Sequence, residues 1–208
     1  MNVVMVHGFL NTGRQFGTLG RMLASRGHAC HAPTLHPRDG RLGIPDLSAK
    51  LASFIEGNIP RGAPLALVGF SMGALVARHY LQALGGAQRA KAYFSIAGPH
   101  EGTRSAYLYP SLGTRQMRPG SAFLLSLAAG ARALETLPTF TYRTPFDLMV
   151  IPHASARIQG SGETVLWCPL HALLTRDRQL GAHIAGELAT LEARTAHQSG
   201  EPTHEPAV

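Results

Sequence analysis

The sequence contains little cysteine and no long apolar run. Cys30 and Cys168 are the two cysteines among 208 residues, too few for the disulfide framework that stabilises many small secreted domains. We therefore expect two reduced, buried thiols. No apolar run approaches the length that a membrane-spanning helix needs.

The first residues do not have the pattern that is typical of a secretory leader. The sequence opens on the apolar run MNVVMV, which His7 and Gly8 interrupt before it is long enough for a signal peptide, and no basic segment precedes it. On this basis we expect a cytoplasmic protein, or a secreted one if a leader has been removed.

Acidic residues are scarce relative to basic ones. The chain has 19 Lys and Arg against 12 Asp and Glu, a formal net charge of +7. Such a charge favours nucleic acid or anionic membrane surfaces as partners. The arginines are scattered, however, and no dense basic run is interleaved with aromatic residues. We therefore expect no nucleic-acid binding and no obligate protein partner. A transient contact with a lipid surface is left as an alternative.

Apolar strand-like runs alternate along the chain with segments of helical periodicity. This alternation predicts an α/β fold, a mostly parallel sheet with helices on both faces. We expect one domain over 1–195 and a disordered tail over 196–208. The expected strands are 2–6, 28–34, 65–70, 92–97, 146–151 and 163–168. The expected helices are 15–26, 46–57, 72–84, 121–137 and 176–194, and 98–120 has no clear period.

The strongest functional signal is the run GFSMG, in which Ser71 lies between a buried strand and a helix. A tight strand-to-helix turn forces the central residue into a strained backbone conformation, and glycines at the flanking positions prevent side-chain collisions. The turn would raise the Ser71 hydroxyl above the sheet at the positive end of the following helix. The pattern in this context predicts a nucleophilic serine.

A second signal is the run HGF at the end of the first strand. Acyl transfer needs two backbone N–H groups aimed at the developing oxyanion. One would come from Met72, directly after the nucleophile, and the other from Phe9. Gly8 would let this loop approach the substrate closely.

With these motifs, the chain resembles the lipase and esterase branch of the α/β-hydrolases. It is similar to small bacterial triacylglycerol lipases and the related PGAP1-like lipase group. The resemblance covers most of the chain, through VVMVHGF, GFSMGALVARHYL, IAGPHEGT, RQMRPGSAFL and TPFDLMVIPHASA to the segment around His171. It implies a minimal α/β-hydrolase fold and a triad in the order serine, acid, histidine.

The resemblance implies that Asp147, in TPFDLMVIP, is the triad acid. Asp147 lies at the beginning of the apolar run 146–151, whereas a triad acid is expected after a strand. A loop or helix-capping carboxylate is the alternative role for it. Glu163 and Asp177 are the alternative acids.

The resemblance also implies that His171, in CPLHALLTRD, is the general base, within hydrogen-bonding distance of Asp147. His153 is the main rival, although it follows the expected acid-bearing strand too closely. The remaining candidates are His183 within the last helix, His197 and His204 in the tail, and His7 and His100, which would line or brace the site.

These residues predict hydrolysis of carboxylic esters through an acyl-enzyme, without a metal or another cofactor. The substrate would be a small acyl ester or a lipid. Segment 101–120 would either cap the site and bind the acyl group or form an ordinary surface loop whose tyrosines pack on the nearest helix. The expected substrate-binding residues are His7, Gly8, Leu10, Tyr107 and Leu108, with Tyr109 beside them in the cap. An acyltransferase, thioesterase or amidase with the same triad stays open, as does a non-catalytic binding protein of this fold.

Clustered metal-ligating residues also occur, near the second expected strand. His28 and His31 do not alternate along that strand and would not share a face of the sheet. We therefore predict no metal site there.

Overall fold

The computed structural model describes residues 1–199, with side chains through Arg194. Six parallel strands form one sheet in the order β2-β1-β3-β4-β5-β6. The strands are β1 (Asn2–Val6), β2 (Ala29–His31), β3 (Leu65–Phe70), β4 (Ala90–Ile96), β5 (Thr139–Arg143) and β6 (Gly162–Val165). The predicted α/β fold with a parallel sheet is confirmed.

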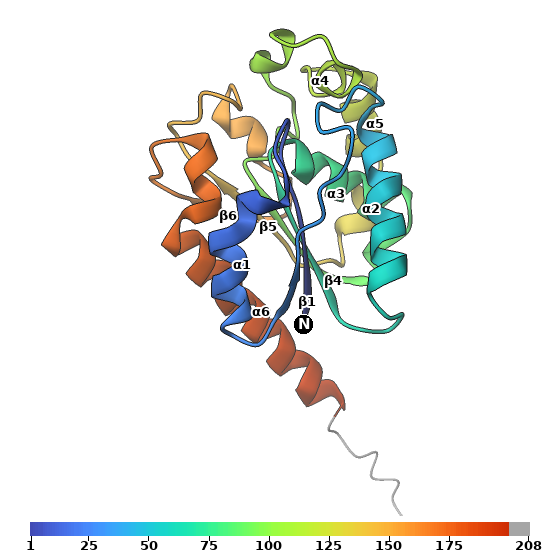
Figure 1. Cartoon of the computed structure of the whole chain (residues 1–208), viewed down its shortest axis with the longest axis vertical. Coiled ribbons are helices and arrows are strands. Elements are labelled where there is room, and N and C mark those ends of the chain that lie inside the picture. The colour runs from blue at the N-terminus through green and yellow to red at the C-terminus, as the bar shows by residue number, and fades with distance from the viewer. Residues whose placement is uncertain (200–208) are drawn as a thin grey trace, which may run out of the picture.

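Helices cover both faces of the sheet (Figure 1). The α-helices are α1 (Gly17–Ala24), α2 (Ile44–Asn58), α3 (Met72–Ala83), α4 (Leu112–Gln116), α5 (Ala122–Ala129) and α6 (Arg178–Ser199). The 3-10 helices are η1 (Gly13–Phe16), η2 (Gly86–Gln88), η3 (Arg104–Tyr107), η4 (Ala131–Leu134), η5 (His153–Ala156) and η6 (His171–Arg176). One core cluster joins α2, α3 and α5 to the sheet, and the other joins α1 and α6 to the opposite face.

The strands β1 and β3 are almost entirely apolar because each contributes to both cores. In β1, Val4 and Val6 belong to the cluster beneath α2 and α3, whereas Val3 and Met5 belong to the cluster beneath α1 and α6. Successive side chains of a strand point to opposite faces, so a doubly covered strand has no polar side. Because all six strands are parallel, the connections that follow them leave the sheet at one edge, its carboxyl edge.

One strand was predicted in the wrong place. Segment 146–151 is irregular, and the fifth strand is β5, formed by the run TFTYR. The side chain of Asp147 accepts hydrogen bonds from the N–H groups of Met149 and Val150, and Thr103 accepts one from Ile151. These N–H groups are thereby unavailable for a sheet ladder. The sheet is built instead from the β-branched and aromatic residues of β5.

Two further expectations need correction. The helix predicted over 121–137 divides at Gly130 into α5 and η4, and segment 98–120 contains η3 and α4. The helix α6 continues to Ser199, into the range expected to be a disordered tail, and residues 200–208 lie outside the described residues. No helix among the described residues has the length and apolarity needed to cross a membrane.

Candidate active site

Ser71 occupies the turn between β3 and α3 in a strained conformation. Its φ of 54° and ψ of −124° lie outside the regions that residues with a side chain readily adopt. The backbone N–H of Ser71 donates to the carbonyl of Ile96 on the neighbouring strand over 2.9 Å, which helps to fix the turn. Strain held in this way at a single serine is typical of a nucleophile elbow.

The two glycines of GFSMG are required by close backbone contacts. A Cβ atom on Gly69 would lie 2.4 Å from the Cα of Ala74, and one on Gly73 would lie 2.1 Å from the carbonyl oxygen of Val6. Both distances are far below a van der Waals contact, and the obstructing atoms belong to the backbone. Any larger residue at either position would therefore displace the turn that carries Ser71.

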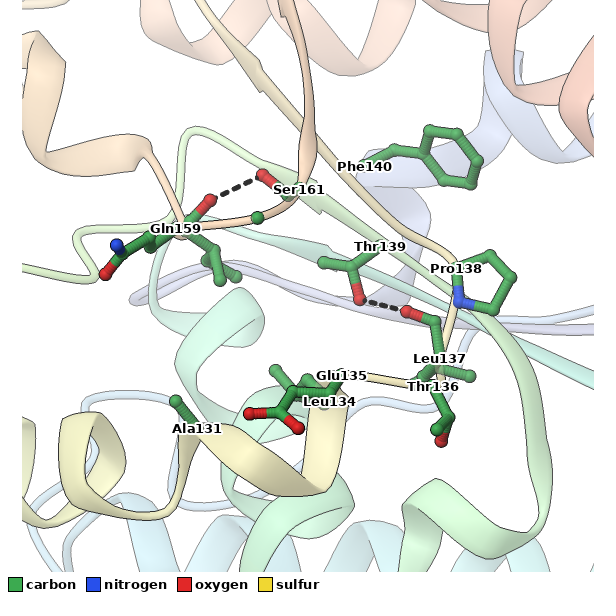
Figure 2. A pocket seen from close by; sticks show the side chains of 12 residues that line it. Ala131, Leu134, Glu135, Thr136, Leu137, Pro138, Thr139, Phe140, Gln159 and Ser161 are labelled. Atoms are coloured by element: carbon green, nitrogen blue, oxygen red, sulfur yellow. Dashed lines mark hydrogen bonds between the residues drawn. The ribbon is translucent and has the colours of Figure 1, made fainter.

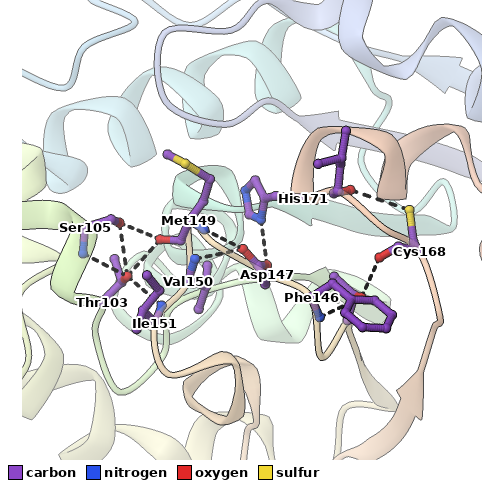
Figure 3. A network of polar contacts seen from close by, with 11 residues as sticks. Thr103, Ser105, Phe146, Asp147, Met149, Val150, Ile151, Cys168 and His171 are labelled. Atoms are coloured by element: carbon purple, nitrogen blue, oxygen red, sulfur yellow. Dashed lines mark hydrogen bonds and ion pairs between the residues drawn. The ribbon is translucent and has the colours of Figure 1, made fainter.

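Asp147 and His171 form a hydrogen-bonded pair at the carboxyl edge of the sheet (Figure 3). Asp147 follows β5 and His171 follows β6, and His171 Nδ1 lies 2.7 Å from Asp147 Oδ2. A carboxylate only accepts hydrogen bonds, so the proton of the imidazole lies on Nδ1 and Nε2 is left as its basic atom. The two side chains are 1% and 10% exposed, respectively, which shields the pair from water.

Asp147 also shapes its own turn. Its Oδ1 accepts hydrogen bonds from the N–H groups of Met149 and Val150, each over 2.8 Å (Figure 3). One carboxylate oxygen therefore fixes the loop while the other orients His171. The loop-forming role considered for Asp147 as an alternative coexists with the pairing to histidine.

The imidazole of His171 lies beside the nucleophile turn. Its ring centroid is 4.6 Å from that of Phe70, the residue that precedes Ser71. Within the described part of the chain, Ser71 Oγ makes no hydrogen bond to His171. Catalytic hydrogen bonds often shorten only when substrate is bound. His171 is therefore hydrogen-bonded to Asp147 and packs against Phe70, the residue before Ser71.

Two threonines that sequence reasoning did not single out, Thr144 and Thr103, hold this arrangement in place, and Figure 3 shows Thr103 beside Met149. Thr144 donates through Oγ1 to the carbonyl of Cys168 over 2.6 Å, linking the acid turn to the segment that carries His171. Thr103 donates to the carbonyl of Met149 over 2.8 Å. Both threonines lie in stretches that carry the family resemblance, TPFDLMVIP and IAGPHEGT, and that is the signal that could have identified them.

The alternative base His153 and the alternative acids Glu163 and Asp177 have partners other than Ser71 and His171. Arg143 donates to His153 Nδ1 over 2.9 Å and also pairs with Glu163. Asp177 Oδ1 accepts the N–H groups of Gln179 and Leu180 at the beginning of α6. His183 meets the hydroxyl of Tyr142 over 3.0 Å. None of these contacts joins a rival residue to Ser71, and His197 and His204 lie outside the described side chains.

The loop after β1 approaches the nucleophile closely. A Cβ on Gly8 would lie 3.2 Å from the Cβ of Ser71. The N–H groups of Gly8 and Leu10 are engaged, by Gln15 Oε1 and by the carbonyl of Arg38. Among the described residues, no hydrogen-bond acceptor is found for the N–H of Phe9. Met72 begins α3, where a helix supplies no acceptor of its own.

His7 and His100 are buried and contact neighbouring parts of the protein. His7 Nε2 accepts the N–H of Leu35 and its Nδ1 contacts the carbonyl of Gly8, each over 2.9 Å. This leaves neither ring nitrogen of His7 for substrate. His100 Nε2 lies 2.7 Å from Ser95 Oγ. Burial lowers the pKa of both histidines, and Arg78 lowers that of His100 further, so both are neutral near pH 7.

Segment 101–120 contacts the loop after β1 and the loop after β2. Tyr109 packs edge-on against Phe9 with ring centroids 5.0 Å apart. Tyr107 lies beneath the guanidinium of Arg118, and Leu108 is largely exposed. The N–H of Gly113 donates to the carbonyl of Gly40 over 2.8 Å, which anchors α4 to the loop after β2. Of the expected substrate-binding side chains, Leu10, Tyr107 and Leu108 are exposed at the carboxyl edge.

A cavity of about 730 Å³ lies at the other end of the sheet (Figure 2). Pro138 and Phe140 line it at the beginning of β5, and Gln159 and Ser161 line it just before β6. Because the strands are parallel, this cavity and Ser71 are at opposite edges. It is therefore separate from the candidate site.

Cys30 in β2 and Cys168 after β6 are free thiols at opposite sides of the sheet, and Cys168 alone is fully buried. Among the residues that the structure describes, no three His, Cys, Asp or Glu side chains are placed to hold a metal ion.

Solved structures share this fold at low sequence identity. Lipase B of Aspergillus fumigatus matches 90% of the chain with a TM-score of 0.76 and 17% identity, and the chain spans 52% of that protein's length. A Bacillus licheniformis lipase matches with a TM-score of 0.69 and 15% identity, covering 91% of each chain. A pyrethroid hydrolase of Sphingobium faniae matches with a TM-score of 0.62 and 16% identity, covering 95% of this chain and 99% of that one.

Comparison with curated protein sequences finds no significant match. The sequence pattern of the Alpha/beta hydrolase family, by contrast, matches residues 3–199. This match covers nearly the whole chain, including the nucleophile turn and the Asp147–His171 pair. The chain therefore belongs to the alpha/beta hydrolase family.

Proposed function

We propose that this protein hydrolyses carboxylic esters, with Ser71 as nucleophile, His171 as general base and Asp147 as the acid that orients the base. The observation that carries the proposal is the 2.7 Å hydrogen bond between His171 Nδ1 and Asp147 Oδ2, formed at the same sheet edge as the strained Ser71. A nucleophile, a base and an orienting acid in one place are the requirements for covalent acyl transfer.

In the first half of the reaction, His171 Nε2 takes the hydroxyl proton of Ser71 as Oγ attacks the ester carbonyl carbon. Asp147 keeps the imidazole in the required tautomer and stabilises the cation that forms. The backbone N–H groups of Phe9 and Met72 would donate to the oxyanion. Such donors contribute roughly 10²–10³-fold to the rate each.

The tetrahedral intermediate then collapses, and His171 returns the proton to the departing alcohol. A covalent acyl-serine remains. In the second half, His171 takes a proton from water, the hydroxide oxygen attacks the acyl carbon, and Ser71 leaves with the proton from His171. The products are a carboxylic acid and an alcohol.

The surroundings of Phe9 support an apolar acyl group as substrate. Tyr109 packs on Phe9, and Leu10 and Leu108 are exposed apolar side chains on the loops beside it. We assign acyl binding to these residues, because an acyl chain would cover apolar surface that otherwise contacts water.

A panel of p-nitrophenyl esters with increasing acyl length tests the proposal. Hydrolysis of at least the short esters is expected, and Tyr109→Ser should reduce turnover of long esters more than that of short ones. Leu125→Ser, an exposed apolar residue on α5, is the matched control and should alter neither. Absence of hydrolysis across the panel by folded protein would contradict the proposed function.

A further inference from the structure

The exposed large apolar side chains are concentrated at one edge of the molecule. Within the described residues, all of them except Leu84, Leu125 and Val165 lie in the segments that leave the carboxyl ends of the strands. We call these segments the rim. It comprises residues 7–16, 32–43, 97–120, 144–151 and 166–176. They gather toward the upper end of the molecule in Figure 1, away from the N-terminus.

Side chains on different rim segments are exposed to an unusual degree for their size. Leu108 is 87% exposed, Leu148 is 74% exposed and Trp167 is 73% exposed. Phe146 and Trp167, which follow β5 and β6, contact each other with ring centroids 5.8 Å apart. A cluster of apolar groups on a water-facing edge is costly unless a partner covers it.

The rim is also strongly basic. Its basic residues are Arg14, Arg38, Arg41, Arg104, Arg115, Arg118 and Arg176. Its acidic residues are fewer: Asp39 lies 3.9 Å from Arg41, Glu101 is exposed, and Asp147 is buried against His171. A second copy of this chain docking through the same edge would bring like charges together, so the charge favours an anionic partner.

The loops after β1 and β2 carry a hollow suited to that charge. It has a volume of about 440 Å³ and is lined by Arg14, His36 and Arg38, among others. A second hollow, of about 240 Å³, places the exposed Leu10 beside Arg38 and Arg41. The planar guanidinium of arginine matches the geometry of phosphate oxygens, and an apolar side chain beside it suits the adjoining acyl region of a phospholipid.

We propose that the rim is a docking surface for bilayers that contain anionic phospholipid. The arginines contact the phosphate headgroups, and Leu148 and Trp167 enter the boundary between headgroups and acyl chains. Docking of this kind orients Ser71 toward the bilayer, because β3 ends at the same edge. A catalytic role for this orientation rests on the proposed function, whereas the docking itself does not.

Trp167 is the single tryptophan of the chain, so its fluorescence reports the docking directly. The protein carrying Ser71→Ala is mixed with vesicles of phosphatidylcholine alone or with added phosphatidylglycerol. The emission of Trp167 should move to shorter wavelength with the anionic vesicles, and the apparent affinity should fall at least tenfold when salt is raised from about 0.1 M to 0.5 M.

Two pairs of substitutions with matched controls locate the contact. Leu148→Ser with Leu170→Ser should weaken vesicle binding at least tenfold, whereas Leu84→Ser with Leu125→Ser, exposed but outside the rim, should leave it unchanged. Co-sedimentation with the vesicles measures all these variants.

For the charges, Arg104→Gln with Arg115→Gln should weaken binding and flatten its salt dependence. The matched control is Arg26→Gln with Arg132→Gln, at positions that precede β2 and β5. Circular dichroism confirms that each variant is folded.

The inference is overturned if Trp167 emission is the same with and without anionic vesicles, or if rim variants bind as well as their controls. Elution as a dimer, with Trp167 already shielded before vesicles are added, would also overturn it in favour of self-association. Vesicle binding by a protein that hydrolyses no ester would leave the docking surface in place and remove the proposed function alone.

Discussion

His171 Nδ1 lies 2.7 Å from Asp147 Oδ2, and these two residues reach each other from the connections that follow two neighbouring strands, β5 and β6. The other carboxylate oxygen of Asp147 accepts two backbone N–H groups of its own turn. The position of the imidazole is therefore set by a carboxylate whose own position is fixed by the backbone. Because the two oxygens of Asp147 have different partners, a substitution can disturb the orientation of His171 and still keep the hydrogen bonds that hold the turn.

Asp147→Asn should leave a folded protein with a kcat for ester hydrolysis lowered about 10⁴-fold. The amide oxygen of asparagine can still accept the hydrogen bonds of the turn N–H groups, whereas its NH₂ group cannot accept a hydrogen bond from His171 Nδ1 and therefore favours the wrong tautomer. Steady-state kinetics measure the loss and thermal unfolding checks the fold. Asp177→Asn, at the beginning of α6, is the matched control and should retain activity.

His171→Gln and His153→Gln distinguish the two candidate bases. We expect His171→Gln to lower kcat by several orders of magnitude, because no other imidazole among the described residues is bonded to Asp147. His153→Gln should keep most of the activity, because its ring nitrogen is bound by Arg143. Comparable losses in both variants, at unchanged thermal stability, would show that the base is assigned wrongly.

The stability of the fold should decrease in mild acid. Burial, and for His100 also the charge of Arg78, lowers the pKa of His100 and His7 from the usual 6.5. Below pH 6.5 the unfolded chain binds protons that the folded chain does not, so the free energy of unfolding falls as pH is lowered through this value. The slope is at most about 1.4 kcal/mol per pH unit for each histidine.

Urea unfolding between about pH 7.5 and pH 5.5 measures this effect. The free energy of unfolding should decrease continuously over that interval, and His100→Asn should show a shallower decrease than the native chain. A free energy that is constant or rises as pH falls would contradict the assignment of buried neutral histidines.

Much of the fold and of the site could be predicted because the signals are local. The strands β1 and β3 are uninterrupted apolar runs, and the glycines beside Ser71 mark a turn that only glycine allows. The strand β5 was missed because it is short and rich in polar residues, ending on Arg143, whereas the neighbouring run FDLMVI is more apolar. That run belongs to the exposed rim, and an apolar segment on a surface cannot be told from a buried strand by composition.

Asp147 was identified through a motif, although it was placed at the beginning of a predicted strand, 146–151, and in fact follows β5. The expected hydrogen bond to His171 is present, but the sequence could not indicate how it is supported. Thr144 contacts the carbonyl of Cys168, and Thr103 contacts the loop at Met149 across a long sequence separation. Contacts between residues so far apart depend on the assembled sheet and have no local pattern.

A fluorophosphonate probe, applied to the native chain and to Ser71→Ala, tests the assignment of Ser71 as the nucleophile of an ester hydrolase. This assignment predicts one covalent adduct, located on Ser71 by mass spectrometry, and loss of both the adduct and ester hydrolysis in folded Ser71→Ala protein. An adduct on another residue, or hydrolysis retained by Ser71→Ala with contaminating enzyme excluded, would contradict it.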